Sequence, residues 1–308
     1  MAFSSTEGEE MKLLVKGKVK EVHELDGQTL RFRFTDQISV FDKVIPSLIP
    51  RKGESLCRTS AFWFQLAKGS GIPSHFIGTP APNEMDVRRV RQVPRLDMPD
   101  SQRHDVMLPL EFICRHYVAG SLWDRLRSGK LAREGLGITA APGYGMKLPE
   151  PVFEVTTKFE EFDRSVTFGE AVSGLGLRAE ELDAAREMTL KMDSLMARQV
   201  EPRGLMHVDG KKEFALGPEG QLMLIDTFGT ADEDRWWDAK AYAEGRFVEL
   251  SKEFVRQYYR GTGYHGALTE AREAGRAEPD IPELPPQMVE DTADLYAKLF
   301  ERLTGQVF

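Results

Sequence analysis

Apolar and polar side chains alternate over residues 15–35, and this period of two is typical of β-strands that bury one face. In the segment 30–35 (LRFRFT) every second side chain is apolar. The pair Asp26-Gly27 before it is favoured in the tight turns that join antiparallel strands. The sequence therefore predicts a β-hairpin near the start of the chain, with three lysines on one face of its first strand.

Both helix and strand patterns recur further along the chain. Apolar residues at three- and four-residue steps predict a long helix over 179–200. Period-two runs and turn residues predict a strand at 110–117 and a second hairpin, with strand segments 205–208, 213–216 and 221–226 around the turn at 217–220. Further helices are predicted at 55–68, 247–259 and 288–303, a strand at 87–93, a loop at 135–151 and a loose segment at 261–287. This mixture predicts an α+β fold.

The length of the chain bears on its division into domains. A chain of 308 residues has room for about two domains. The polar segment 92–106 is interrupted by prolines and is the best candidate for a connection between them. We therefore expect two lobes, a small β-rich lobe at residues 11–105 and a larger α+β lobe at residues 106–308 that includes the C-terminal helices.

Composition excludes several classes of protein. No run of residues approaches the 18 or so apolar positions of a membrane-spanning helix, and the first ten residues lack the apolar stretch of a secretory signal. The net charge of −8 argues against binding to nucleic acid or to anionic membranes. Cys57 and Cys114 are too few for a disulfide scaffold. We expect a cytoplasmic protein, and the sequence leaves open whether it forms a homo-oligomer.

The first candidate site is the lysine-rich segment that contains Gly17. Glycine lets a ligand approach the backbone closely, and lysines at alternate positions can present positive charge to phosphate oxygens. Lysines are also common on exposed edge strands, where they prevent aggregation. Both interpretations stay open from these residues alone, which are Lys16, Gly17, Lys18 and Lys20.

A second candidate is a group of carboxylates near the ends of the second hairpin's strands. Asp209, Glu213 and Asp226 can converge there, with Lys211 between the first two. Mg²⁺ takes oxygen ligands and commonly uses one or two carboxylates together with nucleotide phosphates. Carboxylates that merely cap the strands are an equally good interpretation of the pattern.

A third candidate is Arg115, which follows an apolar strand. An arginine in that place is costly to bury alone, so it reaches solvent, pairs with an acid such as Glu111 or binds an anion. Gly120-Ser121 follows and can supply a backbone amide and a hydroxyl ahead of a helix. We favour an anion site here. The six histidines show no metal-ligand spacing, and the pair Cys114 and His116 is too isolated to predict a nucleophile.

These candidate residues lie in motifs that together resemble the SAICAR synthetase family. The segment 107–121 (MLPLEFICRHYVAGS) is similar to the first signature of that family, and 207–215 (HVDGKKEFA) is similar to the second. Shorter similarities are GKVKEV at 17–22, DQISVFD at 36–42, IPRKGE at 49–54, TTK at 156–158, Asp226, and Arg235-Trp236. The resemblance runs from about residue 14 to about residue 260.

The resemblance implies a reaction and a fold. It implies a two-lobed fold with ATP in the cleft between the lobes. It also implies ATP-dependent ligation of L-aspartate to the carboxylate of carboxyaminoimidazole ribonucleotide, which gives SAICAR, ADP and phosphate in purine biosynthesis. Phosphorylation turns the carboxylate into an acyl phosphate that an amine can attack. Mg²⁺ and lysines would neutralise the charge on the transferred phosphoryl group.

The resemblance also implies roles for particular residues, each of which is an expectation at this point. Gly17, Lys18, Lys20 and Lys158 would bind ATP, and Glu213 and Asp226 would hold Mg²⁺. Substrate would be bound by Ser39, Asp42, Arg115, Ser121 and Arg235. Lys211 and Asp209 are the candidate catalytic residues.

The chain departs from the family's signatures at a few positions. His207 and Lys212 stand where the second signature has apolar residues, Cys114 replaces an aliphatic residue, and Thr227 follows Asp226 in place of glutamate. These departures leave open a ligase of the same fold that acts on a related nucleoside or nucleotide in a specialised pathway. A two-lobed phosphotransferase is a weaker alternative, because no kinase-like catalytic loop is present. A nucleotide-binding regulator without activity is also weaker, because the chain retains all of the charged residues Lys18, Lys20, Arg115, Glu213 and Asp226.

Overall fold

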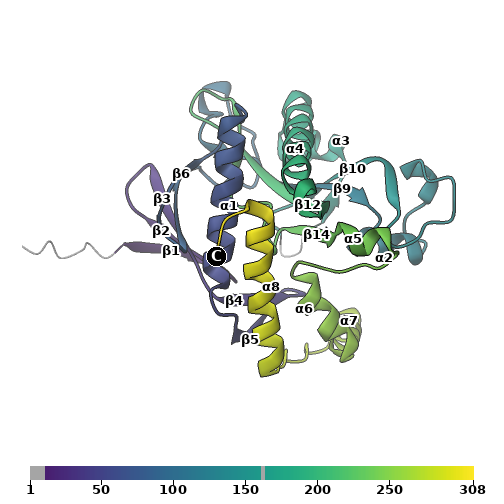
Figure 1. Cartoon of the computed structure of the whole chain (residues 1–308). Coiled ribbons are helices and arrows are strands. Elements are labelled where there is room, and N and C mark those ends of the chain that lie inside the picture. Colours follow the sequence, from purple (N-terminus) through teal and green to yellow (C-terminus); the bar gives the residue numbers. More distant parts are fainter. Residues whose placement is uncertain (1–10, 161–163) are drawn as a thin grey trace, which may run out of the picture.

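The computed structural model describes residues 11–160 and 164–308, and it has the predicted α+β architecture (Figure 1). The N-terminal part contains an antiparallel five-stranded sheet in the order β1-β2-β3-β7-β6. Its strands are β1 (Lys12–Lys16), β2 (Lys20–Glu24), β3 (Thr29–Phe34), β6 (Phe76–Ala81) and β7 (Glu84–Arg88). A separate two-stranded ribbon pairs β4 (Gln37–Val40) with β5 (Lys43–Leu48).

The predicted first hairpin is present, but the prediction for its first strand is wrong in one respect. β2 and β3 pair in antiparallel register, and Phe32 and Phe34 are buried as the alternation requires. Residues 17–19, however, form a turn between β1 and β2, in which the Gly17 N–H donates to the Lys20 carbonyl at 2.8 Å. Lys16, Lys18 and Lys20 therefore do not share one strand face, because the chain reverses between them.

A larger sheet, in the order β11-β10-β9-β12-β13, forms the centre of the molecule, and β14 and β8 also pair with β12. β9 has the predicted bounds, but β12 is one continuous strand where two segments were expected, and β10 begins inside the predicted loop at 135–151. The strands are β8 (Val106–Met107), β9 (Leu110–Tyr117), β10 (Lys147–Thr157), β11 (Ser165–Val166), β12 (Leu205–Leu216), β13 (Leu222–Ile225) and β14 (Asp234–Asp238).

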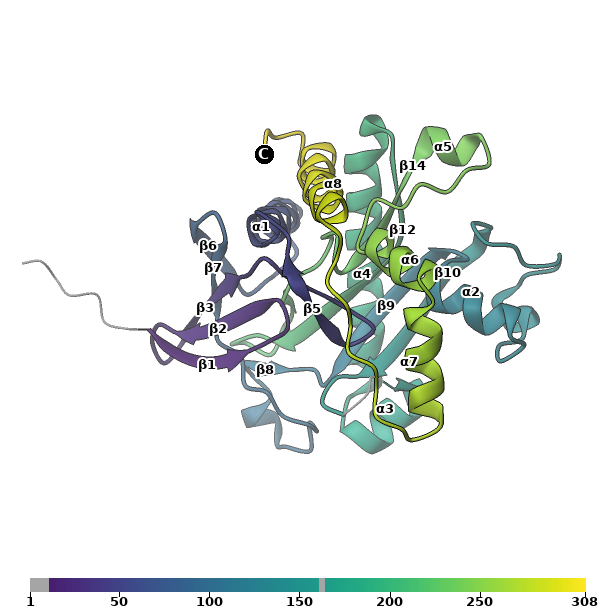
Figure 2. The same cartoon turned by 90° about the horizontal axis from the view of Figure 1, so that it is seen from below.

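Helices pack around the sheets, and the last helix of the chain lies beside the first (Figure 2). They are α1 (Lys52–Gly69), α2 (Gly120–Arg127), α3 (Phe168–Leu175), α4 (Ala179–Val200), α5 (Ala239–Ala243), α6 (Glu253–Gly261), α7 (Tyr264–Glu273) and α8 (Pro286–Thr304), with short 3₁₀ turns at Asp100–Gln102, Arg133–Leu136 and Glu201–Arg203. The α4 prediction is confirmed to the residue. The helix predicted at 247–259 begins only at Glu253, and the segment predicted to be loose contains α7.

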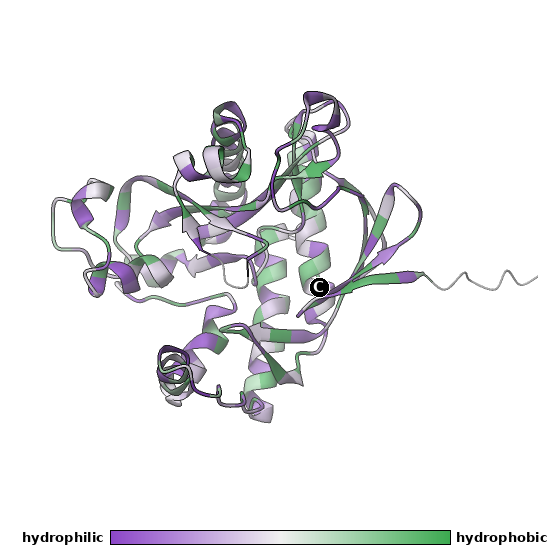
Figure 3. Cartoon of the chain, turned by 180° about the vertical axis from the view of Figure 1, so that it is seen from behind, coloured by the Kyte–Doolittle hydropathy of each residue, from purple (hydrophilic) through white to green (hydrophobic). Residues whose placement is uncertain are grey.

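One cluster of buried apolar side chains runs from the first hairpin to the C-terminal helix. Hydrophobic residues gather on the helices and strands at the centre of the molecule (Figure 3). α8 packs on α1, where the Ser55 hydroxyl donates to the Tyr296 carbonyl at 3.0 Å and Arg58 lies over the Phe300 ring. The five-stranded sheet lies wholly before residue 105 and the larger sheet wholly after it. The division into lobes at that residue stays a prediction.

Candidate active site

Three adjoining hollows lie where the first hairpin faces the large sheet. The apolar hollow is lined by Val22, Leu30, Phe32, Val87, Met107 and Ile225. The lysine hollow is lined by Gly17, Lys18, Lys20, Asp226 and Thr227. The arginine hollow is lined by Ser39, Asp42, Arg115, Ser121, Asp209, Lys211 and Arg235. Lys20 and Asp226 line both of the first two hollows, and Glu233 lines both of the last two, so the three form one continuous cleft.

Lys20 and Asp226 meet at the centre of this cleft. The Lys20 ammonium at the start of β2 forms an ion pair with the carboxylate of Asp226, which directly follows β13. Asp226 has a φ of 58°, a left-handed conformation that is uncommon for residues other than glycine and that often marks a functional position. Asp42, also at positive φ, accepts from Lys18 Nζ at 2.7 Å. Acids from two other parts of the chain therefore pair with lysines of the turn at residues 17–20, which we call the lysine turn.

A second group of charges stands on one face of the large sheet. Because side chains alternate along a strand, Lys211 and Glu213 of β12 point to the same face, and Glu111 of neighbouring β9 joins them. Lys211 Nζ lies 2.6 Å from Glu111 Oε1 and 3.0 Å from Glu213 Oε1. Lys158, which follows β10, lies 2.6 Å from Glu213 Oε2. The carboxylate of Glu213 is therefore shared by two ammonium groups.

These charges shift one another's ionisation. Burial opposes ionisation of Asp226, but Lys20, Lys158 and Lys211 outweigh it and hold the pKa of this carboxyl below its usual range. Burial raises the pKa of Glu111, and Lys211 offsets only part of that rise because Glu213 adds to it. Burial lowers the pKa of Lys158, yet Glu213 and Asp226 reverse this effect and raise it. Asp226 and Lys158 therefore stay charged at neutral pH.

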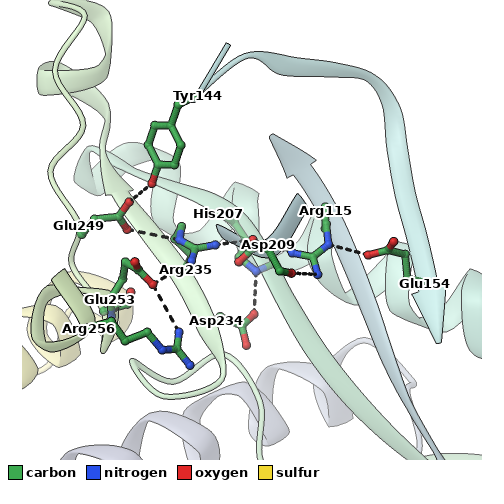
Figure 4. A network of polar contacts seen from close by, with 12 residues as sticks. Arg115, Tyr144, Glu154, His207, Asp209, Asp234, Arg235, Glu249, Glu253 and Arg256 are labelled. Carbon is green, nitrogen blue, oxygen red and sulfur yellow. Dashed lines mark hydrogen bonds and ion pairs between the residues drawn. The ribbon is translucent and has the colours of Figure 1, made fainter. Parts of the chain in front are cut away.

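Two arginines share one carboxylate in the arginine hollow (Figure 4). Asp209 Oδ2 accepts from Arg235 Nη1 at 2.5 Å and from Arg115 Nη1 at 3.4 Å. Arg115 also donates to Glu154 at 2.8 Å and to the Ser121 hydroxyl at 3.1 Å. The suggestion that Arg115 pairs with Glu111 is wrong, because Glu111 lies against Lys211 instead. Both guanidinium groups are buried and fixed, which suits bidentate binding of an anion.

The position of Arg235 depends on Gly120 and on two further acids. Arg235 Nη2 lies 3.2 Å from Glu253 Oε2, and its Nε lies 3.4 Å from Glu249 Oε2, which Tyr144 also contacts through the other carboxylate oxygen. Gly120, at the start of α2, has a φ of +50°, and a Cβ at that position would lie 2.8 Å from Arg235 Nη2. A glycine is therefore required for Arg235 to lie against the start of α2.

Every residue predicted for the site lines one of the three hollows. Their individual roles stay predictions. The arginine hollow is lined by further charged residues that were not predicted from the sequence, among them Glu233, Lys252, Glu253, Arg256 and Arg260. The four-residue spacing of Arg256 and Arg260 on α6 could have indicated a basic helix face. Nothing in the sequence indicated that this face turns toward β12.

Comparisons with known proteins give consistent results. The SAICAR synthetase family model matches residues 13–271. A phosphoribosylaminoimidazole-succinocarboxamide synthase of Thermoplasma acidophilum is 54% identical over 299 residues, covering 96% of this chain and 99% of that protein. The protein of the same name from Thermoplasma volcanium is 52% identical over 296 residues, covering 96% and 99%. A solved SAICAR synthetase in complex with ADP superposes with a TM-score of 0.70 at 25% identity, covering 96% of this chain and 98% of that one.

Among residues 11–160 and 164–308, no helix combines the length and the apolar character needed to cross a membrane.

Proposed function

We propose that the continuous cleft is the active site of this chain, which belongs to the SAICAR synthetase family. The chain is an ATP-dependent carbon–nitrogen ligase that forms SAICAR in purine biosynthesis. The observation that carries the proposal is the meeting of Lys20 and Asp226, which brings the lysine turn of one sheet to the acidic strands of the other. The three hollows around this pair differ in chemistry, and each suits a different part of the substrates.

The reaction needs two successive transfers. A carboxylate oxygen of carboxyaminoimidazole ribonucleotide attacks the γ-phosphorus of ATP, the bond to the bridging oxygen breaks, and ADP leaves. The amine nitrogen of L-aspartate then attacks the acyl carbon, phosphate leaves with its bonding electrons, and the nitrogen loses a proton. No protein nucleophile is required, so binding, orientation and charge stabilisation supply the rate.

ATP is assigned to the apolar and lysine hollows. The flat, apolar adenine ring suits side chains such as Val22, Leu30 and Ile225. The turn at Gly17 presents backbone close to the lysine hollow, and a side chain there would meet the Lys20 carbonyl at 2.9 Å. The ammonium groups of Lys18, Lys20 and Lys158 would then exchange their present carboxylate partners for phosphate oxygens.

Glu213 and Asp226 are assigned to Mg²⁺. Both supply hard oxygen donors, both line the apolar hollow beside Lys158, and Asp226 stays ionised because nearby lysines favour its charge. Three carboxylates, those of Glu111, Glu213 and Glu233, form ion pairs with Lys158 or Lys211, and Asp226 pairs with Lys20 beside them, so the donor set suits a divalent cation. When bound, Mg²⁺ would neutralise charge on the β- and γ-phosphates.

The ribonucleotide is assigned to the arginine hollow. Arg115, Ser121 and Arg235 offer several donors that Asp209 and Glu154 hold in fixed orientation, as binding of a phosphate or carboxylate requires. Ser39 and Asp42 line the same hollow from the β4–β5 ribbon and face the substrate side. Lys211 lies between this hollow and Glu213, where its ammonium would direct the substrate carboxylate toward ATP.

We also assign the enzyme to the cytoplasm. Cys57 and Cys114 are buried and free, and burial raises the pKa of Cys57 to about 12, so this thiol stays protonated. Free thiols suit a reducing compartment.

A substrate-omission assay tests the proposal. ADP release is measured with ATP and Mg²⁺ present while aspartate, the ribonucleotide or both are left out, and the product is identified by mass. We expect ADP and SAICAR only with the complete mixture. Faster turnover with another amine or another carboxylated nucleoside would favour the specialised ligase, and ADP release with neither acceptor would contradict the proposal.

A further inference from the structure

The back of the large sheet carries a second, separate group of reactive side chains. On β9, Cys114 and His116 point to the face opposite Arg115, where α4 packs. Asp193 of α4 is buried between the helix and the sheet and meets them there. Cys114, His207 and Lys212 are three of the positions at which the chain departs from the family's signatures, and all three belong to this group.

The ligand atoms of Cys114, His116 and Asp193 lie within 4.8 Å of one another. Cys114 Sγ is 3.8 Å from His116 Nε2, which is 2.9 Å from Asp193 Oδ2. Around a tetrahedral zinc ion a thiolate sulfur and an imidazole nitrogen lie about 3.5 Å apart, and a nitrogen and a carboxylate oxygen about 3.3 Å apart. The first of the two observed distances is thus about 0.3 Å longer, and the second about 0.4 Å shorter, than around a zinc ion.

His207 supplies an independent observation. Its side chain is only 1% exposed, and its Nδ1 has no hydrogen-bond partner among the described residues. That nitrogen lies 3.9 Å from Asp193 Oδ1. His207 is not one of the three residues whose ligand atoms all lie within 4.8 Å of one another, so its ring would have to move toward them to bind the same ion. The other ring nitrogen, Nε2, is 2.7 Å from Asp234, whose second oxygen accepts from the Gly229 N–H at 2.7 Å. A carboxylate that fixes a histidine in this way is the usual second partner of a metal-binding imidazole.

The charges around the group also favour a cation. Asp193 and Asp234 contribute two negative charges, and Lys212, fully buried and paired with Asp193 Oδ1, contributes one positive charge. These three groups together carry one net negative charge. A divalent ion bound to the Cys114 thiolate would add one positive charge to them. Lys212 pairs with Asp193 Oδ1, so the other oxygen, Oδ2, is the one that faces His116.

We propose that Cys114, His116, Asp193 and His207 form a structural zinc site that joins β9, β12 and α4 behind the catalytic face. One thiolate, two imidazoles and one carboxylate are a ligand set typical of tetrahedral Zn²⁺. Binding releases the Cys114 thiol proton, moves the His116 ring proton to Nδ1 and leaves the His207 proton on Nε2, donated to Asp234. The ion would fix the strands whose opposite faces carry Arg115, Asp209 and Lys211.

Metal analysis of the full chain, purified without a histidine tag, tests this site. The protein is stripped with a chelator, reloaded with Zn²⁺ alone and desalted, and its zinc content and melting temperature are measured. We expect about one zinc per chain and a higher melting temperature. Cys57→Ser, which removes the other buried thiol, and Asp226→Asn, which alters the proposed Mg²⁺ site, should retain the zinc.

Cys114→Val and His116→Asn should lose at least about tenfold in zinc affinity. If Cys114→Val does not fold, Co²⁺ added to the stripped wild-type protein decides the question, because a cobalt–thiolate bond gives a charge-transfer band in the near ultraviolet. Wild-type protein without zinc and without this band would overturn the proposal. Equal zinc binding by Cys114→Val would also overturn it. Neither result bears on the ligase reaction, which Asp226→Asn tests separately.

Discussion

Lys20 and Asp226 form an ion pair across 206 positions of sequence, and this pair joins the lysine turn to the acidic strands of the large sheet. The pair is partly buried, and Lys20 also lies over the Phe32 ring at 4.2 Å. ATP and Mg²⁺ would each take one of the two partners. The ion pair therefore joins the two sides of the cleft, and bound substrates would replace it.

Replacing Asp226 with asparagine should lower turnover far more than it lowers stability. Asparagine has a similar shape but lacks the charge that the proposed Mg²⁺ site requires, so we expect kcat to fall on the order of 100-fold or more. Steady-state kinetics and a thermal melt measure the two effects. Asp100→Asn, which breaks a surface ion pair with Arg178, is the control and should keep full activity. Normal turnover by the Asp226→Asn variant would contradict the assignment of Asp226 to Mg²⁺.

Arg115→Lys should mainly weaken binding of the ribonucleotide. Lysine keeps the charge but cannot donate to Asp209, Glu154 and Ser121 at once, because it lacks the planar fork of arginine. We expect KM for the ribonucleotide to rise about tenfold to a hundredfold, with KM for ATP little changed. Arg95→Lys, on an exposed ion pair with Asp97, is the matched control. A rise in KM for ATP alone would contradict the assignment of Arg115 to the ribonucleotide site.

Gly120→Ala should impair the same site by displacing Arg235. The new methyl group would lie 2.8 Å from the Arg235 guanidinium, and the backbone at φ +50° is also strained for alanine. Gly129→Ala separates the two effects, because Gly129 has a φ of +73° but a Cβ added there would meet nothing within 4 Å. We expect both variants to lose about 1 kcal/mol of stability. Only Gly120→Ala should raise KM for the ribonucleotide, and equal kinetics of the two variants would contradict this explanation.

His75 should make stability depend on pH between about 4 and 6.5. Burial lowers the pKa of this histidine to about 4 from its usual 6.5, and its Nε2 lies 3.3 Å from the Asp226 carbonyl. The unfolded chain binds a proton in this window while the folded chain does not, so the free energy of unfolding falls as pH drops from 6.5 toward 4. The loss amounts to about 3 kcal/mol. Urea unfolding at several pH values should show a shallower dependence for His75→Gln, and an unchanged dependence would refute the assignment.

The fold could be predicted in those segments where apolar residues recur throughout at the spacing of a helix or of a strand. β9 and α4 have the predicted bounds because their apolar residues recur at constant spacing against one buried layer. The lysine segment was predicted as a single strand because Val15, Gly17 and Val19 alternate with lysines. The bond from Gly17 N–H to the Lys20 carbonyl reverses the chain instead, and no alternation rule indicates a turn of that kind.

The site could be predicted in its residues but not in its pairings. Motif similarity indicated Arg115, Asp209 and Arg235, yet the sharing of Asp209 by both arginines depends on the register of β12 with β9 and β14. The group on the back of the sheet was missed for the same reason. Cys114 and His116 are two residues apart, whereas Asp193 comes from a helix 77 positions beyond His116, so ligand spacing along the chain could not indicate it.

Whether the reaction takes place in this cleft can be seen in a crystal structure of the chain with Mg²⁺, a non-hydrolysable ATP analogue and the ribonucleotide. The structure should show the phosphates of the analogue at the Gly17–Lys20 turn, the ion on Glu213 and Asp226, and the ribonucleotide on Arg115 and Arg235. Nucleotide bound outside this cleft, with the Lys20–Asp226 ion pair intact, would contradict it.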